Sequence, residues 1–367
     1  MINEFVLIIL WVGICAFFGK YSKIKRTELI EGVEEERFPM YFAIIVLIPL
    51  VFMIANRDFE IGDTWAYKIS FGKMPSEFSQ ISEYMSTITK DSWFYLFSAV
   101  IKCIIGENIV LYFGIIAVMQ MIPLVYIYRK YSSNYVVSAF LFIASADYLS
   151  WTFNGIRQFL AVTFIFMAFP LLLKKKYIPL ILIIIFASMF HRSALLMIPV
   201  VFIVQGEAWN KKTLSIIVLT LLVVFFVSQF TDILDSSLAD TQYANVVSDY
   251  TSWKDDGTNP FRVAVYCIPA IISFVFRKDI KVLNNKAINI CSNLSIVTAG
   301  MYIISMVTSG IFLGRLPIYT SLFNYILLPW EIDNLFEVDT KKIVFALMVI
   351  LYLLYYYYQA SVMWGLF

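Results

Sequence analysis

The stretch Thr213–Phe230 reads TLSIIVLTLLVVFFVSQF and the stretch Ala287–Ser309 reads AINICSNLSIVTAGMYIISMVTS, and neither contains a charged residue. Each is close to the roughly 20 residues that a helix needs to cross the hydrocarbon layer of a membrane. The whole chain is similarly apolar, since 60% of its 367 residues are hydrophobic and 15% are charged. A soluble domain has about 25% charged residues. The sequence therefore predicts an all-α, polytopic integral membrane protein.

Apolar runs of this kind recur along the chain, and we interpret about 12 of them as transmembrane helices. Their approximate limits are 2–19, 38–55, 108–128, 135–151, 156–173, 177–190, 193–206, 213–230, 261–276, 287–309, 316–330 and 343–360. The run Ser92–Ile105 is apolar but short, so we expect a re-entrant or interfacial helix there. The first run has no basic segment before it and no small-residue cleavage site, which favours a retained helix over a signal peptide. We expect 1–367 to form a single membrane domain.

The lysines and arginines predict the orientation of this domain. Alternate loops are rich in them, namely residues 20–37, 129–130, 174–176, 211–212, 277–286 and 341–342. Basic loops stay on the cytoplasmic side of a membrane, so both termini are expected outside. The two long loops on the outer side, 56–107 and 231–260, are predicted to form lids over a site.

Five arginines do not fit this charge bias. Arg57, Arg157, Arg192, Arg262 and Arg315 lie at or beside the outer ends of apolar runs. A guanidinium at the membrane margin is costly without a partner, and it can grip a phosphate through two hydrogen bonds. Each one alone could snorkel or cap a helix. Snorkelling does not explain five on the side that the charge bias depletes, so the set predicts a site for an anionic ligand near the outer leaflet.

The segment Asn154-Gly155-Ile156-Arg157-Gln158 is the densest polar motif before an apolar run. The i, i+3 and i+4 spacing puts Asn154, Arg157 and Gln158 on one helical face. A helix that starts here directs its positive end toward the ligand of Arg157. A polar helix cap is the structural alternative.

Two residues are candidates for proton transfer. His191 is the only histidine of the chain, and a histidine titrates near neutral pH. A lone histidine is also commonly a hydrogen-bonded structural residue, and the sequence leaves both roles open. Asp63 follows Gly62 in a turn that places a carboxylate close to Arg57, where a local ion pair is the alternative.

A last motif is Gly314-Arg315-Leu316-Pro317-Ile318-Tyr319, in which Arg315 and Tyr319 are one helical turn apart and can present to one ligand. Arg262 follows Pro260 in a similar position at the start of another apolar run. No second histidine or cysteine stands at ligand spacing from His191, so we expect no metal and no cofactor. The absence of a basic tract with interleaved aromatics argues against nucleic acid as a partner.

In this order, the motifs resemble those of the EpsG family of Wzy-like polysaccharide polymerases. The residues that carry the resemblance are Arg57, Gly62-Asp63-Thr64, Tyr67, Asn154, Ile156-Arg157-Gln158, Ala161, Phe190-His191, Ser193-Ala194, Arg315-Leu316 and Tyr319. They span the chain from Arg57 to Tyr319. Arg192 departs from the pattern, which leaves its role open.

The resemblance implies a GT-C-like fold and a glycosyltransferase of the bacterial cytoplasmic (inner) membrane, with its active site facing the periplasm or the cell exterior. Its substrate would be a polyprenyl-pyrophosphate-linked oligosaccharide, carried on undecaprenyl pyrophosphate and used for exopolysaccharide, capsule or O-antigen. Transfer would be of the inverting type and metal-independent. A chain-length regulator protein is an implied partner, besides membrane lipid.

This chemistry assigns roles to the candidate residues. A sugar hydroxyl needs a base, for which His191 is the first choice and Asp63 the second. Arginines would stabilise the charge that develops on the pyrophosphate. The expected substrate-binding residues are Arg57, Asn154, Arg157, Gln158, Arg192, Arg262, Arg315 and Tyr319.

Three alternatives remain open from the sequence: an O-antigen ligase-like enzyme, a membrane acyltransferase that acts on cell-surface glycan, and a lipid-linked glycan transporter. An acyltransferase would also use a single histidine, but it has no evident need for several outer arginines. A transporter usually has internal repeats and charges near the midplane, whereas the spans predicted here are nearly free of charge and show no repeat.

Overall fold

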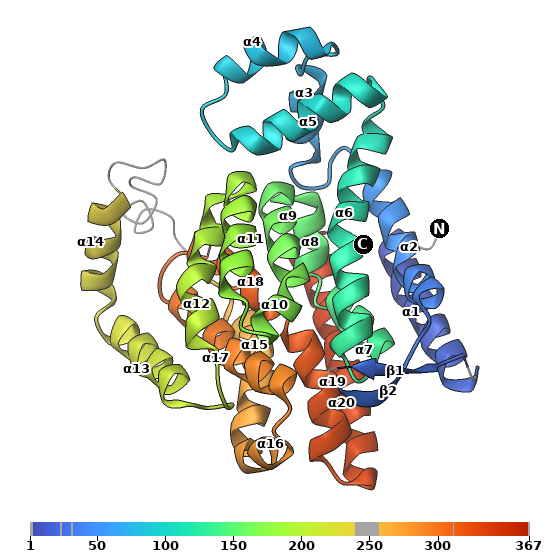
Figure 1. Cartoon of the computed structure of the whole chain (residues 1–367), viewed down its shortest axis with the longest axis vertical. Helices are drawn as coiled ribbons and strands as arrows, with labels where there is room; N and C mark the ends of the chain where they lie inside the picture. The colour runs from blue at the N-terminus through green and yellow to red at the C-terminus, as the bar shows by residue number, and fades with distance from the viewer. Residues whose placement is uncertain (1–2, 23, 31, 239–256, 311, 366–367) are drawn as a thin grey trace. The chain divides into compact units, whose positions relative to one another are not determined.

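The computed structural model describes every residue except 1–2, 23, 31, 239–256, 311 and 366–367. The described chain is helical apart from one two-stranded hairpin (Figure 1). It divides into two compact units, which we describe separately: unit 1 is Met1–Met197 with Glu337–Phe367, and unit 2 is Ile198–Phe336. The all-α architecture is therefore confirmed, with a small sheet that the sequence analysis did not anticipate.

Unit 1 contains the N-terminal helices and the last helix of the chain. Its elements are α1 (Glu4–Tyr21), β1 (Arg26–Ile30), β2 (Val33–Arg37), α2 (Met40–Ala55), α3 (Thr64–Gly72), α4 (Ile81–Ser86), α5 (Ser92–Ile105), α6 (Ile109–Tyr131), α7 (Tyr135–Ala144), α8 (Asp147–Phe153), α9 (Ile156–Met167), α10 (Phe169–Leu173), α11 (Tyr177–Phe190) and α20 (Val338–Tyr357). Shorter helical turns are η1 (Phe78–Gln80), η2 (Arg192–Leu196) and η5 (Tyr358–Met363). The helices α2, α6, α9 and α11 pack against one another in that order.

Unit 2 is built around α17, and α12 (Met197–Ile203) begins with the last residue of unit 1. Its other elements are α13 (Lys211–Phe225), α14 (Val227–Leu238), α15 (Pro260–Val275), α16 (Arg277–Leu283), α17 (Lys286–Met306), η4 (Leu313–Arg315), α18 (Ile318–Ser321) and α19 (Asn324–Leu335). The helix α17 packs against α13, α15, α18 and α19. Its buried face carries small polar residues, which let helices in a membrane approach closely. An example is Thr298, whose Oγ1 donates to Thr320 Oγ1 at 2.7 Å.

Four helical segments in the described part of the chain are long and apolar enough to cross a membrane: α1, α6, α17 and Val338–Met363. The number rises to 6 if two bent pairs each count as one span. These pairs are α7 with α8, bent by 69°, and α13 with Val227–Leu234, bent by 95°. Six further apolar helices are shorter, and α5 is one of them.

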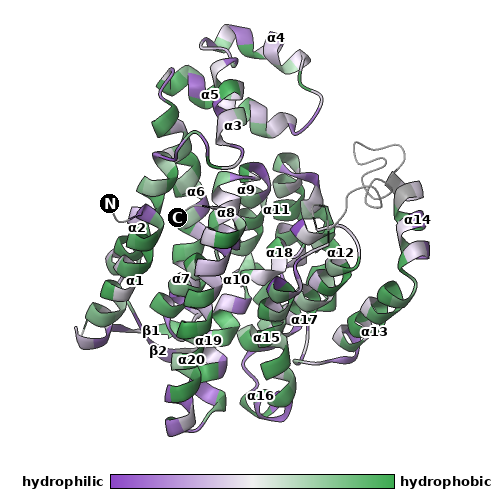
Figure 2. Cartoon of the chain, turned by 180° about the vertical axis from the view of Figure 1, so that it is seen from behind, coloured by the Kyte–Doolittle hydropathy of each residue, from purple (hydrophilic) through white to green (hydrophobic). Residues whose placement is uncertain are grey.

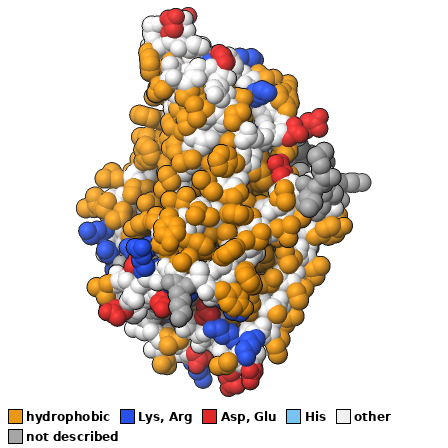
Figure 3. All heavy atoms as spheres, turned by 90° about the vertical axis from the view of Figure 1, so that its right-hand side faces the viewer, with side chains coloured by type: hydrophobic (Ala, Val, Ile, Leu, Met, Phe, Trp, Pro, Cys, Tyr) orange, Lys and Arg blue, Asp and Glu red, His pale blue; other side chains and the backbone are white. Residues whose placement is uncertain are grey.

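The surface of unit 1 fits a lipid environment. Figure 2 shows hydrophobic residues along most of α1, α2 and α6, and Figure 3 shows hydrophobic side chains over the middle of one face with charged ones toward its ends. Phe17 of α1 and Phe52 of α2 are each 63% exposed. Large contiguous apolar surfaces are rare on soluble monomers, so these faces support a membrane protein.

Two predicted spans are sharply bent. Residues 135–151 break at Ala146, which has a φ of 58° and separates α7 from α8. Residues 213–230 turn at Phe226, between α13 and α14. Neither break follows a proline or a glycine, the residues that usually mark a kink, and the polar Ser145 and Asp147 beside Ala146 do not by themselves predict a bend.

The loop 20–37 also differs from expectation, because it forms an antiparallel hairpin in which Arg26 pairs with Arg37 and Ile30 with Val33. Gly32 in its turn has a φ of 91°, a conformation that tight hairpins require. Arg37 and Arg129 pair with carboxylates of the two strands, Glu35 and Glu28. The hairpin is fixed to the end of α6 by the Arg129–Glu28 pair and by Arg37 Nε, which donates to the Lys130 carbonyl at 3.1 Å.

The helix expected over Ser92–Ile105 is present as α5 with the same limits. Figure 1 shows α3, α4 and α5 together beyond one end of α6. Lys102 of α5 is 1% exposed and donates to the carbonyl oxygens of Phe71 and Gly72 at 3.0 and 2.9 Å. It thereby caps the C-terminal end of α3 and holds the two helices together.

Candidate functional site

Arg57 follows α2 and is buried, with 7% of its surface exposed. Its Nε donates to the Ile54 carbonyl at 2.8 Å and its Nη1 to the Phe153 carbonyl at 3.4 Å. The guanidinium also lies 4.1 Å from the ring centre of Phe113. Burial lowers the pKa of Arg57 to about 9. The side chain therefore caps the C-terminal ends of α2 and α8, while its buried Nη2 has no hydrogen-bond partner among the described residues.

The ion pair between Asp63 and Arg57 that the sequence suggested is absent from the described residues. The Arg57 guanidinium is directed instead to the ends of α2 and α8. Asp63 is instead held through its backbone, whose N–H donates to Asn154 Oδ1 at 2.9 Å. Gly62 has a φ of 55°, and a Cβ there would lie 1.7 Å from Asn154 Oδ1. The exposed Asp63 carboxylate makes no cap hydrogen bond to α3, so it remains available for chemistry.

Asn154 lies outside the helix that carries Arg157 and Gln158. It ends α8 with a φ of −94° and a ψ of −157°, and α9 starts only at Ile156. The expected single helical face for all three residues is therefore wrong. The three still lie close together because the turn at Gly155 joins the end of α8 directly to the start of α9.

Arg157, in the first turn of α9, contacts α3, α5 and the residue before α5. Its Nη1 donates to Asp91 Oδ2 at 2.6 Å, and its guanidinium lies 5.9 Å from the ring centre of Tyr95. Tyr67 of α3 lies within electrostatic reach of Arg157, and burial raises the pKa of that phenol. The Arg157 side chain keeps 31% of its surface exposed, so an anion can still approach it.

Gln158 and His191 are joined through a residue to which the sequence analysis gave no role. Gln158 Nε2 donates to Ser193 Oγ at 3.3 Å, and that Oγ lies 2.6 Å from His191 Nδ1. His191 Nε2 can act as a base only if the ring proton is on Nδ1. Ser193 Oγ would then accept hydrogen bonds from both His191 Nδ1 and Gln158 Nε2. A hydroxyl oxygen has the two lone pairs that this needs.

The end of α11 places His191 at this site. His191 terminates α11 with a φ of −155°, and its N–H donates to the Ala187 carbonyl. Phe190 packs against Phe97 of α5 and Phe164 of α9, with ring centres 6.0 and 5.3 Å apart. Arg192 starts η2 as an exposed side chain.

One end of unit 1 therefore brings together Asp63, Asn154, Arg157, Gln158 and His191. The helices α3 and α5 lie over this end (Figure 1). Asp91 and Ser193, the partners of Arg157 and Gln158, were not predicted from the sequence. Only the position of Ser193 within the Phe190–Ala194 motif could have drawn attention to it.

Unit 2 carries the remaining candidates. Arg262, in the first turn of α15, lies 5.4 Å from the ring centre of Tyr302. Arg315 is exposed in η4, whereas Tyr319 of α18 is only 1% exposed. The expectation that Arg315 and Tyr319 share a helix face is wrong, because Pro317 separates η4 from α18 and the Tyr319 ring packs into the unit.

Arg262 and Arg315 nevertheless lie at the same end of unit 2. A Cβ at Gly314 would be 2.7 Å from Thr258 Oγ1, which is itself 2.7 Å from Ser305 Oγ. Only a glycine allows η4 to approach the segment before α15 so closely. Of the loop 231–260, residues 239–256 lie outside the described residues.

A polar cavity of about 670 Å³ opens beside Gly62 and Asn154. The two chain ends contribute to its lining, which comprises Asn3, Glu4, Phe5, Asp58, Glu60, Ile61, Gly62, Ser150, Phe153, Asn154, Trp364 and Gly365. Carboxylates and amides can hydrogen-bond to sugar hydroxyls. The sequence analysis missed Glu4, Glu60 and Trp364, because nothing in the sequence places the chain ends beside this loop.

A wholly apolar groove of about 380 Å³ lies along α6, α9 and α11. It is lined by Met119, Ile122, Pro123, Phe164, Met167, Ile183 and Phe186. The Phe186 ring lies 5.4 Å from Phe190, so apolar contacts continue from the groove to the residue before His191. Within the described residues there is no cluster of three or more His, Cys, Asp or Glu that could hold a metal ion.

Comparison with known proteins gives one positive result. The family model described as "EpsG family" matches residues 40–365, which include every candidate site residue. No curated protein and no solved structure matches the chain.

Proposed function

Because the chain belongs to the EpsG family, as its motifs had suggested, we propose that it polymerises polyprenyl-pyrophosphate-linked oligosaccharide repeat units on the outer face of the bacterial cytoplasmic membrane. The observation that carries this proposal is that Arg157, the neighbour of Gln158 in α9, lies beside the hydrogen-bonded residues Gln158, Ser193 and His191 at one end of unit 1. It combines a partly exposed cation with an oriented imidazole, which are the two groups that such a transfer needs.

The proposed reaction is a single displacement at the anomeric carbon of the donor. A hydroxyl of the acceptor sugar forms the new C–O bond, the bond from the anomeric carbon to the pyrophosphate oxygen breaks, and the configuration inverts. The hydroxyl proton passes to His191 Nε2, with the Asp63 carboxylate as the second candidate. The departing pyrophosphate carries the negative charge, which Arg157 and the N-terminal end of α9 stabilise without a metal.

The other arginines have different proposed roles, because their surroundings differ. Arg262 and Arg315, at one end of unit 2, are proposed to bind phosphate oxygens, and the exposed Arg192 is proposed to do so beside His191. Arg57 is proposed to position the turn that carries Asn154, because two of its donors cap helix ends. Gln158 orients His191 through Ser193, and Tyr319 supports η4 from the interior of unit 2.

The cavity beside Asn154 suits the acceptor sugar. Asp58, Glu60 and Asn154 offer oxygen atoms to hydroxyl groups, and Trp364 offers an indole ring for stacking on a sugar face. This cavity includes Gly62, the residue before Asp63. An acceptor held there would therefore have its hydroxyl near one of the two proposed bases.

The apolar groove suits the prenyl chain of the donor. Phe164 is seven residues after Arg157 on α9, which is about 10 Å along a helix. A lipid whose pyrophosphate meets Arg157 would therefore lay its first isoprene units in the groove. The family also supports a GT-C-like arrangement with about 12 spans, outward-facing lids and a chain-length regulator as partner, all of which we include in the proposal.

The test is a panel of Arg157→Ala, Arg315→Ala and His191→Ala in a deletion strain of the native host, with Arg277→Ala on α16 as the matched control. Lipid-linked glycans are extracted and sized. We expect each of the three variants to accumulate single repeat units that are still linked to the lipid carrier on the outer face of the membrane. The control should make normal polymer. Full-length chains that stay linked to the lipid carrier would indicate a ligase instead. Repeat units trapped on the cytoplasmic face would indicate a transporter. Normal polymer from all three variants would refute the assignment of the site.

A further inference from the structure

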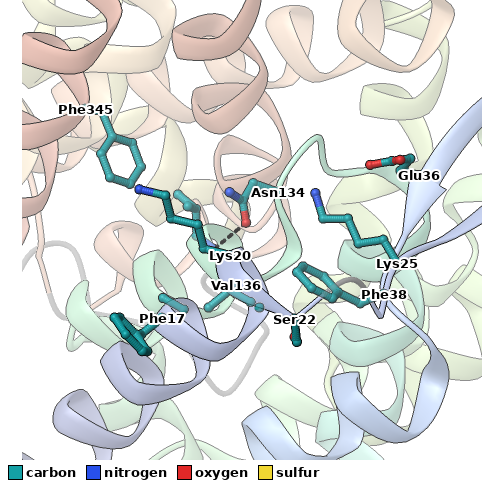
Figure 4. A pocket seen from close by; sticks show the side chains of 12 residues that line it. Phe17, Lys20, Ser22, Lys25, Glu36, Phe38, Asn134, Val136 and Phe345 are labelled. Carbon is teal, nitrogen blue, oxygen red and sulfur yellow. Dashed lines mark hydrogen bonds between the residues drawn. The ribbon is translucent and has the colours of Figure 1, made fainter.

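A second cavity of unit 1, of about 660 Å³, lies at the end of α1 remote from the candidate site (Figure 4). The candidate site's cavity touches Asn3–Phe5, whereas this one touches Ala16–Lys20. About 15 residues separate the two segments, which is roughly 20 Å along a helix. The remaining walls are the start of the hairpin, the start of α7, and Phe345 of α20.

Two lysines of this cavity are not neutralised. Among the described residues, neither Lys20 nor Lys25 forms an ion pair, whereas the nearby Arg37 and Arg129 pair with glutamates. Lys20 lies 5.5 Å from the ring centre of Tyr21 and Lys25 lies 5.2 Å from that of Phe38. In Figure 4 the two lysines flank Asn134. Glu36 also lines the cavity, so two ammonium groups face one carboxylate and positive charge is left over.

The geometry of α1 and α20 gives the cavity an apolar side. Near the candidate site the two helices are joined, because Tyr356 Oη donates to the Phe5 carbonyl at 2.7 Å. At the other end the cavity separates Phe17 of α1 from Phe345 of α20, which are 63% and 40% exposed. The two helices therefore form a wedge that opens among lipid-facing side chains.

We propose that this cavity binds an anionic phospholipid, with its phosphate at Lys20 and Lys25 and an acyl chain between Phe17 and Phe345. Basic pockets between transmembrane helices on the cytoplasmic side recognise acidic headgroups, and the loop 20–37 belongs to the basic, cytoplasmic set. A soluble phosphate would leave the apolar wall without a partner, and a zwitterionic lipid would leave the excess positive charge. This inference does not depend on the proposed catalytic function.

Native mass spectrometry of the purified full-length protein in detergent can test the proposal. Phosphatidylglycerol and phosphatidylcholine with identical acyl chains are added separately and the retained lipid is counted. We expect one phosphatidylglycerol to be retained preferentially. The double variant Lys20→Gln/Lys25→Gln should bind it about tenfold or more weakly, from the loss of two lysine–headgroup attractions. The double variant Lys174→Gln/Lys176→Gln removes two exposed lysines from another basic loop and should bind it normally.

A second variant separates the apolar wall from the charge. Ala16 is exposed and lines the cavity, so Ala16→Trp should fill the wedge and weaken phosphatidylglycerol binding while both lysines remain. Glycerol 3-phosphate should not displace the bound lipid. Equal binding of the two lipids, equal effects of the two lysine pairs, unchanged binding by Ala16→Trp, or displacement by glycerol 3-phosphate would each overturn the proposal.

Discussion

The proposed base at His191 Nε2 requires that Nδ1 carry the ring proton. Ser193 Oγ lies 2.6 Å from Nδ1 and accepts from Gln158 Nε2 at 3.3 Å. In the proposed mechanism Ser193 accepts from both donors and holds this tautomer. The residue thus has a positioning role, and it need not contact substrate.

Replacing Ser193 by alanine should therefore slow transfer without abolishing it. We expect kcat to fall about 10- to 100-fold, a part of the usual contribution of a general base, while KM for the lipid-linked substrate changes little. Gln158→Leu should have a similar effect, and the double variant should be little worse than either, because both act through the same imidazole. Purified protein and lipid-linked repeat units provide the measurement.

The control for Ser193 is Ser188→Ala on α11, whose Oγ bonds only to the Ile185 carbonyl in the described contacts. It should have normal kcat. Additive effects of Ser193→Ala and Gln158→Leu would contradict a shared route through His191.

The sequence predicted these residues better than it predicted their contacts. The motifs around Arg157 and His191 named the residues that meet at one end of unit 1. They could not name Asp91, which reaches Arg157 from 66 positions away. They also misplaced Arg57, because the burial of its guanidinium between Phe113 and Phe153 depends on how three helices pack.

At the scale of elements, the turn before α3 is fixed by close contact with the turn between α8 and α9. A Cβ at Gly62 would lie 1.7 Å from Asn154 Oδ1, and the φ of 55° there suits glycine. Gly62→Ala should therefore detach this turn and reduce polymer formation strongly, while the protein still folds in the membrane. Gly72→Ala is the control, since nothing lies within 4 Å of its Cβ position.

The readouts for Gly62→Ala are the polymer yield and the protein level in membranes. Normal polymer from this variant would show that the docking of the turn is not needed. A loss of membrane protein in both glycine variants would show that the effect concerns folding alone.

The contact of α3 with α5 depends on Lys102, which donates to two carbonyl groups at the end of α3. Lys102→Met should keep most of the apolar contact but leave those carbonyls unpaired, which costs about 1–3 kcal/mol each where they are buried. We expect faster hydrogen exchange in 64–105 and little change in α6 or α9. Lys90→Met, at an exposed position, should leave exchange unchanged, and equal exchange in both variants would contradict the capping role.

Helix positions followed from apolar patterning more readily than helix breaks did. The limits of α5 were predictable because polar residues bound the run on both sides. The breaks at Ala146 and Phe226 have no proline or glycine to mark them, and the polar residues beside Ala146 are too few to predict a bend. The hairpin of 26–37 was concealed by its charges, because its glutamates and arginines resemble those of a basic loop until their pairing is known.

At the scale of the whole molecule, the proposed function requires that His191 and the helices α3, α4 and α5 lie on one side of the membrane. The charge bias predicts that side as the outside. The helix α5 is the critical element, because a crossing there would invert everything that follows it. Its 14 residues extend about 21 Å, less than the roughly 30 Å of hydrocarbon that a span must cover.

Single cysteines on the two sides of α5 can test this arrangement. In a background in which the four native cysteines are replaced by alanine, we expect Lys90→Cys and Glu107→Cys to react with a membrane-impermeant maleimide in intact spheroplasts. Lys174→Cys should react only after permeabilisation, because its loop is one of the basic loops that are predicted to be cytoplasmic. All three positions are exposed, so a difference in labelling reports sidedness and not burial. Labelling of residues 90 and 107 from opposite sides would make α5 a true span, and it would place His191 on the cytoplasmic face, where an enzyme that polymerises exported repeat units could not use it.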